Sequence, residues 1–145
     1  MKDTAILLDT NVVLDWILKR EPFRTNSESI IELCINGEVH GYLACHTILN
    51  LFFILRKDYS VAERKEILMM LCNDFNIIGI DHEILMTALC DENFRDIEDD
   101  VQIQCALFED LDYIVTRDIN GFKDSKIKAI LPEDFLAWRR RGNYA

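Results

Sequence analysis

The sequence has little proline or glycine and no long apolar run. Its 145 residues include only two Pro and five Gly, which excludes collagen-like and low-complexity organisation. The longest apolar segment, around residues 49–55, is interrupted by Asn50 and followed by Arg56 and Lys57, so it is too short to span a bilayer. Residues 1–9 contain no secretory signal. We therefore expect a globular cytoplasmic protein with no membrane partner.

Positive charge is also scarce. Sixteen Lys and Arg oppose 26 Asp and Glu, which leaves a formal net charge of -10. A surface with this acidic surplus repels phosphates, so proteins that coat nucleic acid or membranes non-specifically are excluded. A local site that holds cations, and through them approaches a phosphate, remains compatible with this charge.

Paired cysteines are absent too. The five Cys residues are spread along the chain, and no two have CxxC spacing, which predicts reduced buried thiols rather than disulfides or a zinc site. The three His residues are isolated from one another, and we do not expect them to bind a metal.

Apolar residues make up 50% of the chain, enough for one domain, residues 1–145, with a substantial core. Strands are predicted at residues 5–8, 39–44, 75–80 and 113–116, and a short last strand at residues 129–131. Helices are predicted at residues 11–18, 25–36, 47–56, 61–72, 84–89, 99–109 and 133–139. Asn11 is expected to cap the first helix, and Thr25 with Glu28 has capping-box spacing for the second. This alternation predicts a three-layer α/β/α fold with a central, mainly parallel sheet of four or five strands.

Three acids follow or adjoin the predicted strands. Asp9 comes directly after residues 5–8, Asp118 comes just after residues 113–116, and Asp99 lies in the first turn of the helix before that last strand. Ligands of such sheets bind beyond the carboxyl ends of the strands. Converging carboxylates repel one another unless a cation lies between them, and an all-oxygen set favours Mg²⁺ or Mn²⁺. Each acid also has an ordinary explanation: Asp9 and Asp118 as turn residues, and Asp99 as a complement to the helix dipole.

Several motifs resemble the PIN domain family. The matching segments are "LLDTNVVLDWILKREPF" (residues 7–23), "DIEDDVQ" (96–102), "DYIVTRDINGF" (112–122) and "ILPEDFL" (130–136). Their order and spacing match over nearly the whole chain. The resemblance implies a parallel sheet flanked by helices with an acidic site at the strand ends. It also implies a metal-dependent nuclease, and many members are VapC-like toxins that cleave RNA.

Carried over by position, the resemblance makes Asp9, Asp99 and Asp118 the catalytic, metal-holding acids. Supporting roles would fall to four further residues: Asn11, which would orient Asp9, together with Asn50, Asp96 and Thr116. The resemblance also implies that Arg117 contacts the substrate phosphate. The implied partners are an RNA substrate, an antitoxin protein and a second copy of the chain.

One position departs from the family pattern. The glutamate usual on the helix after the second strand is replaced here by Asn50, in "HTILNLFFILRK" (residues 46–57). An amide offers oxygen without charge, so the site should bind a divalent ion more weakly unless Glu98 or Asp96 compensates. A buried amide also needs partners, which favours Asn50 facing the site.

The sequence thus leaves three functions open. The first is a Mg²⁺- or Mn²⁺-dependent ribonuclease, in which six acids (Asp9, Asp96, Glu98, Asp99, Asp100 and Asp118) gather at one end of the sheet. The second is a catalytically weak or silent PIN-like module that binds RNA or a protein through this groove. The third is another aspartate-based phosphoryl-transfer fold. Asn11 stands where phosphatases of that kind have a second Asp, and Asp81 is the only candidate for a receiver's phosphorylated residue.

Overall fold

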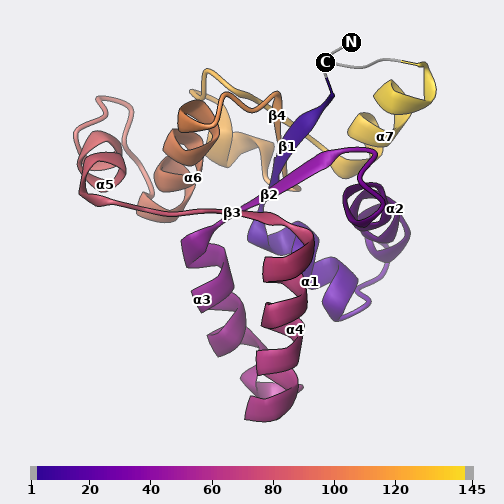
Figure 1. The fold of residues 1–145 in the computed structure, drawn as a ribbon. Coiled ribbons are helices and arrows are strands. Elements are labelled where there is room, and N and C mark those ends of the chain that lie inside the picture. The colour runs from indigo at the N-terminus through magenta and orange to yellow at the C-terminus, as the bar shows by residue number, and fades with distance from the viewer. Residues whose placement is uncertain (1–2, 143–145) are drawn as a thin grey trace.

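A five-stranded, fully parallel sheet forms the centre of the computed structural model, which describes residues 3–142 (Figure 1). The strands are β1 (Ala5–Leu8), β2 (His40–Ala44), β3 (Asn76–Ile78), β4 (Tyr113–Val115) and β5 (Lys128–Ile130). Their order is β3-β2-β1-β4-β5, so the chain builds outward from β1 in one direction and then in the other. The direction changes beside β1, which is where ligands bind in sheets of this kind.

Seven α-helices cover the two faces of this sheet. They are α1 (Thr10–Ile17), α2 (Arg24–Ile35), α3 (Cys45–Ile54), α4 (Val61–Asp74), α5 (His82–Leu89), α6 (Ile97–Phe108) and α7 (Pro132–Arg140), with 3₁₀ helices at Leu55–Lys57 and Ile119–Phe122. Ile6 and Leu8 pack with residues of α1, α2 and α7, whereas Leu7 packs on the opposite face with α5 and α6. The predicted three-layer α/β/α fold is confirmed. In Figure 1, α3 and α4 extend beyond the strand ends.

Two predicted helix starts are wrong. Asp9, and not Asn11, is the N-cap of α1, and its side chain accepts a hydrogen bond from the Thr10 N–H at 2.7 Å. Thr25 lies inside α2, which follows Phe23 without a side-chain cap. Glu28 instead accepts from the Arg24 guanidinium at 2.7 Å, so the expected capping box does not form.

Two other boundaries moved for identifiable reasons. Helix α6 begins at Ile97, ahead of the predicted 99, because the Asp96 side chain accepts from the Asp99 N–H at 3.0 Å and so caps an earlier turn. Strand β3 stops at Ile78, since the segment that follows leads to the Asp81 cap of α5. Within residues 3–142, no helix is both long and apolar enough to cross a membrane.

Candidate active site

Asp9 lies where β1 passes into α1, and four donors surround its carboxylate. Oδ1 accepts from the Thr10 N–H at 2.7 Å and from Gln102 Nε2 at 2.9 Å. Oδ2 accepts from the Thr116 hydroxyl at 2.8 Å and from Asn11 Nδ2 at 3.2 Å. Since Asp9 is only 8% exposed, these donors replace water around the carboxylate and fix its orientation.

Thr116 links the ends of β1 and β4. While its hydroxyl donates to Asp9, it accepts from the Asp118 N–H at 2.9 Å. Asp118 then caps the 3₁₀ helix Ile119–Phe122, because its Oδ1 accepts from the Gly121 N–H at 3.3 Å. One buried hydroxyl therefore holds Asp9 and the backbone of Asp118 in a fixed relation.

Asp99 faces the same acids from the first turn of α6. Its pKa is raised from 3.8 to about 7, chiefly by burial and then by the charges of Asp9, Asp96, Asp118 and Asp100. This shift shows that the side chain lies within electrostatic reach of both strand-end acids. Perturbed carboxyls in such a position are frequent at functional sites.

Gly121 allows Asp99 and Asp118 to approach each other. A Cβ atom at Gly121 would lie 2.7 Å from Asp99 Oδ2 and 3.0 Å from Asp118 Oδ2. Both oxygens therefore border the same small space, which a side chain would fill. Gly121 can approach the two acids this closely only because it has no Cβ.

The other acidic candidates lie near this group but have hydrogen-bond partners of their own. Asp96 uses one oxygen to cap α6, and Asp100 accepts from the Arg95 N–H at 3.0 Å. Glu98 accepts from Asn50 Nδ2 at 3.2 Å, so the amide on α3 faces a carboxylate of α6. Glu98 is not among the charges that raise the pKa of Asp99. Asp96 and Asp100 still act on Asp99, whereas Glu98 is directed towards Asn50.

Arg117 has partners other than those expected for a phosphate contact. Its guanidinium forms two hydrogen bonds to the buried carboxylate of Asp15, at 2.6 and 3.2 Å, and lies 3.9 Å from the Phe23 ring centre. Its backbone N–H donates to Asn11 Oδ1 at 3.4 Å. The guanidinium therefore serves mainly as the counter-charge of Asp15, and only its Nη1 edge is left for a substrate.

Gln102 is a site residue that the sequence analysis missed. It is almost fully buried and donates to Asp9 from α6, three residues after Asp99. Residues three apart lie on the same side of a helix, so this spacing was an available signal. The oxygen Oε1 of the same amide has no hydrogen-bond partner among residues 3–142.

The donor chemistry of Asp9, Asp99 and Asp118 fits a divalent ion, since all three offer hard oxygens: Asp99 and Asp118 border the space beside Gly121, and the charge of Asp9 acts on Asp99. Asn11, Gln102 and Thr116 support this set by orienting Asp9. In the part of the chain that the structure describes, no three His, Cys, Asp or Glu side chains already form a complete ion-binding group. These carboxylates would thus have to draw together around an ion.

Comparisons with known proteins agree with the fold. A toxin–antitoxin complex from Klebsiella pneumoniae is 20% identical, has a TM-score of 0.66, and aligns over 88% of this chain and 97% of its own. VapBC2 from Rickettsia felis, bound to promoter DNA, is 17% identical and has a TM-score of 0.63. The alignment covers 88% of this chain and 98% of the VapBC2 chain. VapBC-1 from nontypeable Haemophilus influenzae is 14% identical and has a TM-score of 0.65. The alignment covers 90% of this chain and 99% of the VapBC-1 chain. No curated protein matches the chain.

The similarity to solved structures, all at low identity, shows a shared fold. A family model gives stronger evidence. The model described as PIN domain matches residues 5–120, which is most of the sequence. That span contains both strand-end acids and Asp99. The chain belongs to the PIN domain family.

Proposed function

We propose that the protein is a metal-dependent ribonuclease that hydrolyses RNA phosphodiesters and acts as the toxin of a toxin–antitoxin pair. The observation that carries this proposal is the grouping of Asp9, Asp99 and Asp118 at the carboxyl ends of β1 and β4, with the pKa of Asp99 raised to about 7 by its neighbours. Carboxylates arranged at a strand-end switch point are suited to holding a cation opposite a phosphate.

In this proposal Asp9, Asp99 and Asp118 hold Mg²⁺ or Mn²⁺ and are the catalytic residues. When bound, the ion supplies charge stabilisation for the phosphate and lowers the pKa of a water molecule. Thr116 and Asn11 keep Asp9 in its orientation through bonds of 2.8 and 3.2 Å. Asp99 must lose its proton to act as a ligand, so ion binding should release protons near neutral pH.

Several partners belong to the same proposal. The similar structures from K. pneumoniae, R. felis and H. influenzae are described as toxin–antitoxin or VapBC proteins, which supports an antitoxin partner. Exposed apolar side chains on α3 and α4, such as Leu49, Phe53 and Met69, support a homodimer. Five free cysteines support a reducing, cytoplasmic location. We also propose that residues 1–145 form one PIN domain.

The test is cleavage of end-labelled RNA in Mn²⁺ by the wild-type protein and by Asp9→Asn. The variant keeps the shape of the side chain but removes its charge, so we expect at least a hundredfold lower rate, in the range that follows loss of a central electrostatic group. Equal cleavage by both proteins would contradict the proposal, because the activity would then come from elsewhere.

A second candidate function is a weak or silent PIN module that binds RNA or a protein. The observation that favours it is Asn50, which bonds to Glu98 instead of adding a carboxylate beside Asp9. Absence of Mn²⁺ binding at millimolar concentrations would support this candidate. A large gain of cleavage in Asn50→Glu would show instead that the wild-type site is a weakened catalytic one.

A further inference from the structure

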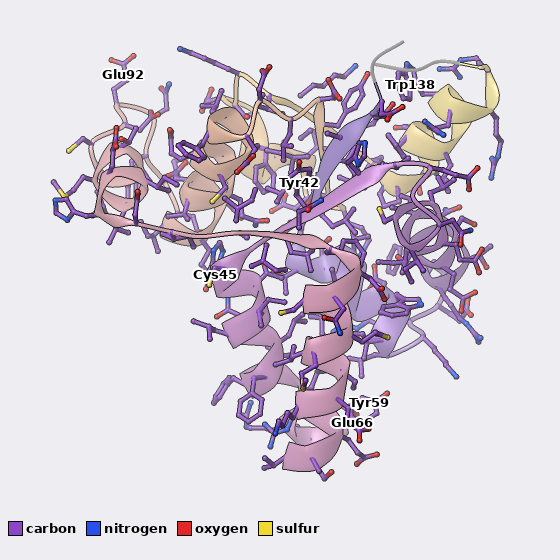
Figure 2. All side chains as sticks on the ribbon, viewed as in Figure 1. Tyr42, Cys45, Tyr59, Glu66, Glu92 and Trp138 are labelled. Atoms are coloured by element: carbon purple, nitrogen blue, oxygen red, sulfur yellow. The ribbon has the colours of Figure 1, made fainter. Side chains whose placement is uncertain are left out.

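A cavity of about 200 Å³ lies beside the carboxylate group, between α3, α5 and α6. Glu98 and Asn50 line its polar end, and the His46 ring lines another part. The remaining wall is aliphatic and includes Leu85 and Val101. In Figure 2, Cys45 marks the place where β2 passes into α3, directly before His46. This volume suits one planar ring better than a larger ligand.

The polar end of this cavity, which we call the Glu98 cavity, offers acceptors. Asn50 Nδ2 donates to Glu98 Oε1 at 3.2 Å. Within residues 3–142, neither Glu98 Oε2 nor Asn50 Oδ1 has a further hydrogen-bond partner, and the exposed Glu98 also meets solvent. A ligand that matches them must bring two neighbouring N–H donors.

The charge around the cavity excludes anions. Glu98 is the largest charge acting on the His46 ring, followed by Asp9 and Asp96, while burial lowers the pKa of His46 and favours its neutral form. Neither ring nitrogen of His46 has a hydrogen-bond partner in the described part of the chain. A phosphate or carboxylate would be repelled here, whereas an uncharged ring would meet aliphatic walls and a flat imidazole.

Glu98 belongs to this cavity and not to the ion-binding group. Its hydrogen bond to Asn50 directs it towards α3, and adjacent side chains of a helix point in different directions, so Glu98 and Asp99 face different ways. Because Glu98 directly precedes Asp99 in the first turn of α6, the cavity adjoins the place where the ribonuclease proposal puts the phosphate.

We propose that the Glu98 cavity binds a guanine base of the RNA, next to the phosphate that is cleaved. The proposal rests on the ribonuclease function proposed above. Guanine carries two neighbouring donors, N1–H and the 2-amino group, which match the acceptors Glu98 Oε2 and Asn50 Oδ1. Adenine, cytosine and uracil each lack one of this pair. An arginine side chain from a partner protein has a similar donor pair, but it is charged and lacks the broad ring that the aliphatic walls would cover.

The test is nucleoside binding to the full ¹⁵N-labelled chain, followed by NMR in metal-free buffer. Guanosine is compared with inosine, which differs only by lacking the 2-amino group, and with N-acetyl-argininamide. We expect guanosine to shift the amides of α3 and α6 around the cavity and inosine to bind about tenfold more weakly, as for loss of one hydrogen bond to a charged group. Equal shifts with inosine, or larger shifts with the argininamide, would overturn the proposal.

Variants give a second measurement. Glu98→Gln places a donor opposite the guanine donors and should abolish the preference for guanosine, whereas Glu66→Gln should retain it. Glu66 is an equally exposed acid towards the far end of α4 (Figure 2). Leu85→Trp should block binding by filling the cavity, and Leu89→Trp on the same helix should not. Retention of the preference in Glu98→Gln would overturn the assignment.

This experiment separates the two proposals, since nucleoside binding needs neither metal nor cleavage. A protein that prefers guanosine but never cleaves RNA would contradict the ribonuclease proposal alone. A protein that cleaves RNA but does not distinguish guanosine from inosine would contradict the cavity assignment alone.

Discussion

The carboxyl group of Asp99 makes stability depend on pH. Its pKa is about 7 in the folded chain, against 3.8 for an aspartate without these neighbours. Between these values the folded chain holds a proton that the unfolded chain has released. The free energy of unfolding should therefore fall as the pH rises from about 4 to about 7.

We expect Asp99→Asn to match the wild-type melting temperature near pH 4 and to exceed it by a few degrees at pH 8. The reason is that Asn resembles the protonated acid and never acquires the repelled charge. Thermal melts in EDTA across this range provide the measurement, with the exposed Asp58→Asn as a control. Parallel profiles for the wild type and Asp99→Asn would show that the repulsion is absent.

Arg117 should matter for stability more than its exposure suggests. Asp15 is fully buried, and Arg117 supplies its two short hydrogen bonds, while Arg20 approaches only to 3.7 Å. Removing Arg117 leaves a buried carboxylate poorly compensated, so Arg117→Ala should cost about 3 kcal/mol. Arg20→Ala should cost less than about 1 kcal/mol. Urea denaturation measures both, and equal losses would contradict this role for Arg117.

At the residue scale, sequence could locate the acids but not most of their partners. Asp9 and Asp118 were predictable because each follows a buried apolar strand closely. The pairing of Asp15 with Arg117, 102 positions apart in the chain, depends on how α1 packs near β4. Gln102 was missed because the sequence analysis did not follow the helix face that it shares with Asp99, three residues earlier.

At the scale of elements, the 3₁₀ helix Ile119–Phe122 controls the space between two carboxylates. A methyl group at Gly121 would displace the flexible ends of Asp99 and Asp118, without affecting the core. Gly121→Ala should therefore weaken Mn²⁺ binding by about tenfold, as changes beside metal ligands commonly do, while leaving the fold intact.

Gly79→Ala is the matched control, since a Cβ there meets no atom within 4 Å. Titration calorimetry with Mn²⁺ compares the two variants, and thermal melts verify folding. Equal Mn²⁺ affinity in both would mean that the space beside Gly121 is not part of an ion site.

Helix starts explain what several of the clustered acids do. Acids in the first turn of a helix satisfy backbone N–H groups, and Asp96 does this for α6 while Asp100 accepts from the Arg95 N–H. The same local chemistry makes Asp9 the cap of α1, in place of the expected Asn11. The strands were predicted more closely, because a short buried apolar run has few alternatives once helices alternate with it.

At the scale of the whole molecule, the net charge of -10 is distributed in distinct places. Asp9, Asp99 and Asp118 face one another, Glu98 faces a separate cavity, and other acids cap helices or lie on the surface. Phosphate can approach this chain only where cations offset the acids. The central claim is therefore that these three carboxylates form one divalent-ion site.

Titration calorimetry with Mn²⁺ at pH 7.5 tests this claim most directly, using the wild type, three single Asp→Asn variants at positions 9, 99 and 118, and the Asp58→Asn control. The wild type and the control should bind Mn²⁺ equally, and each of the three variants should bind it at least about tenfold more weakly. Wild-type binding that persists unchanged in all three variants would contradict the claim.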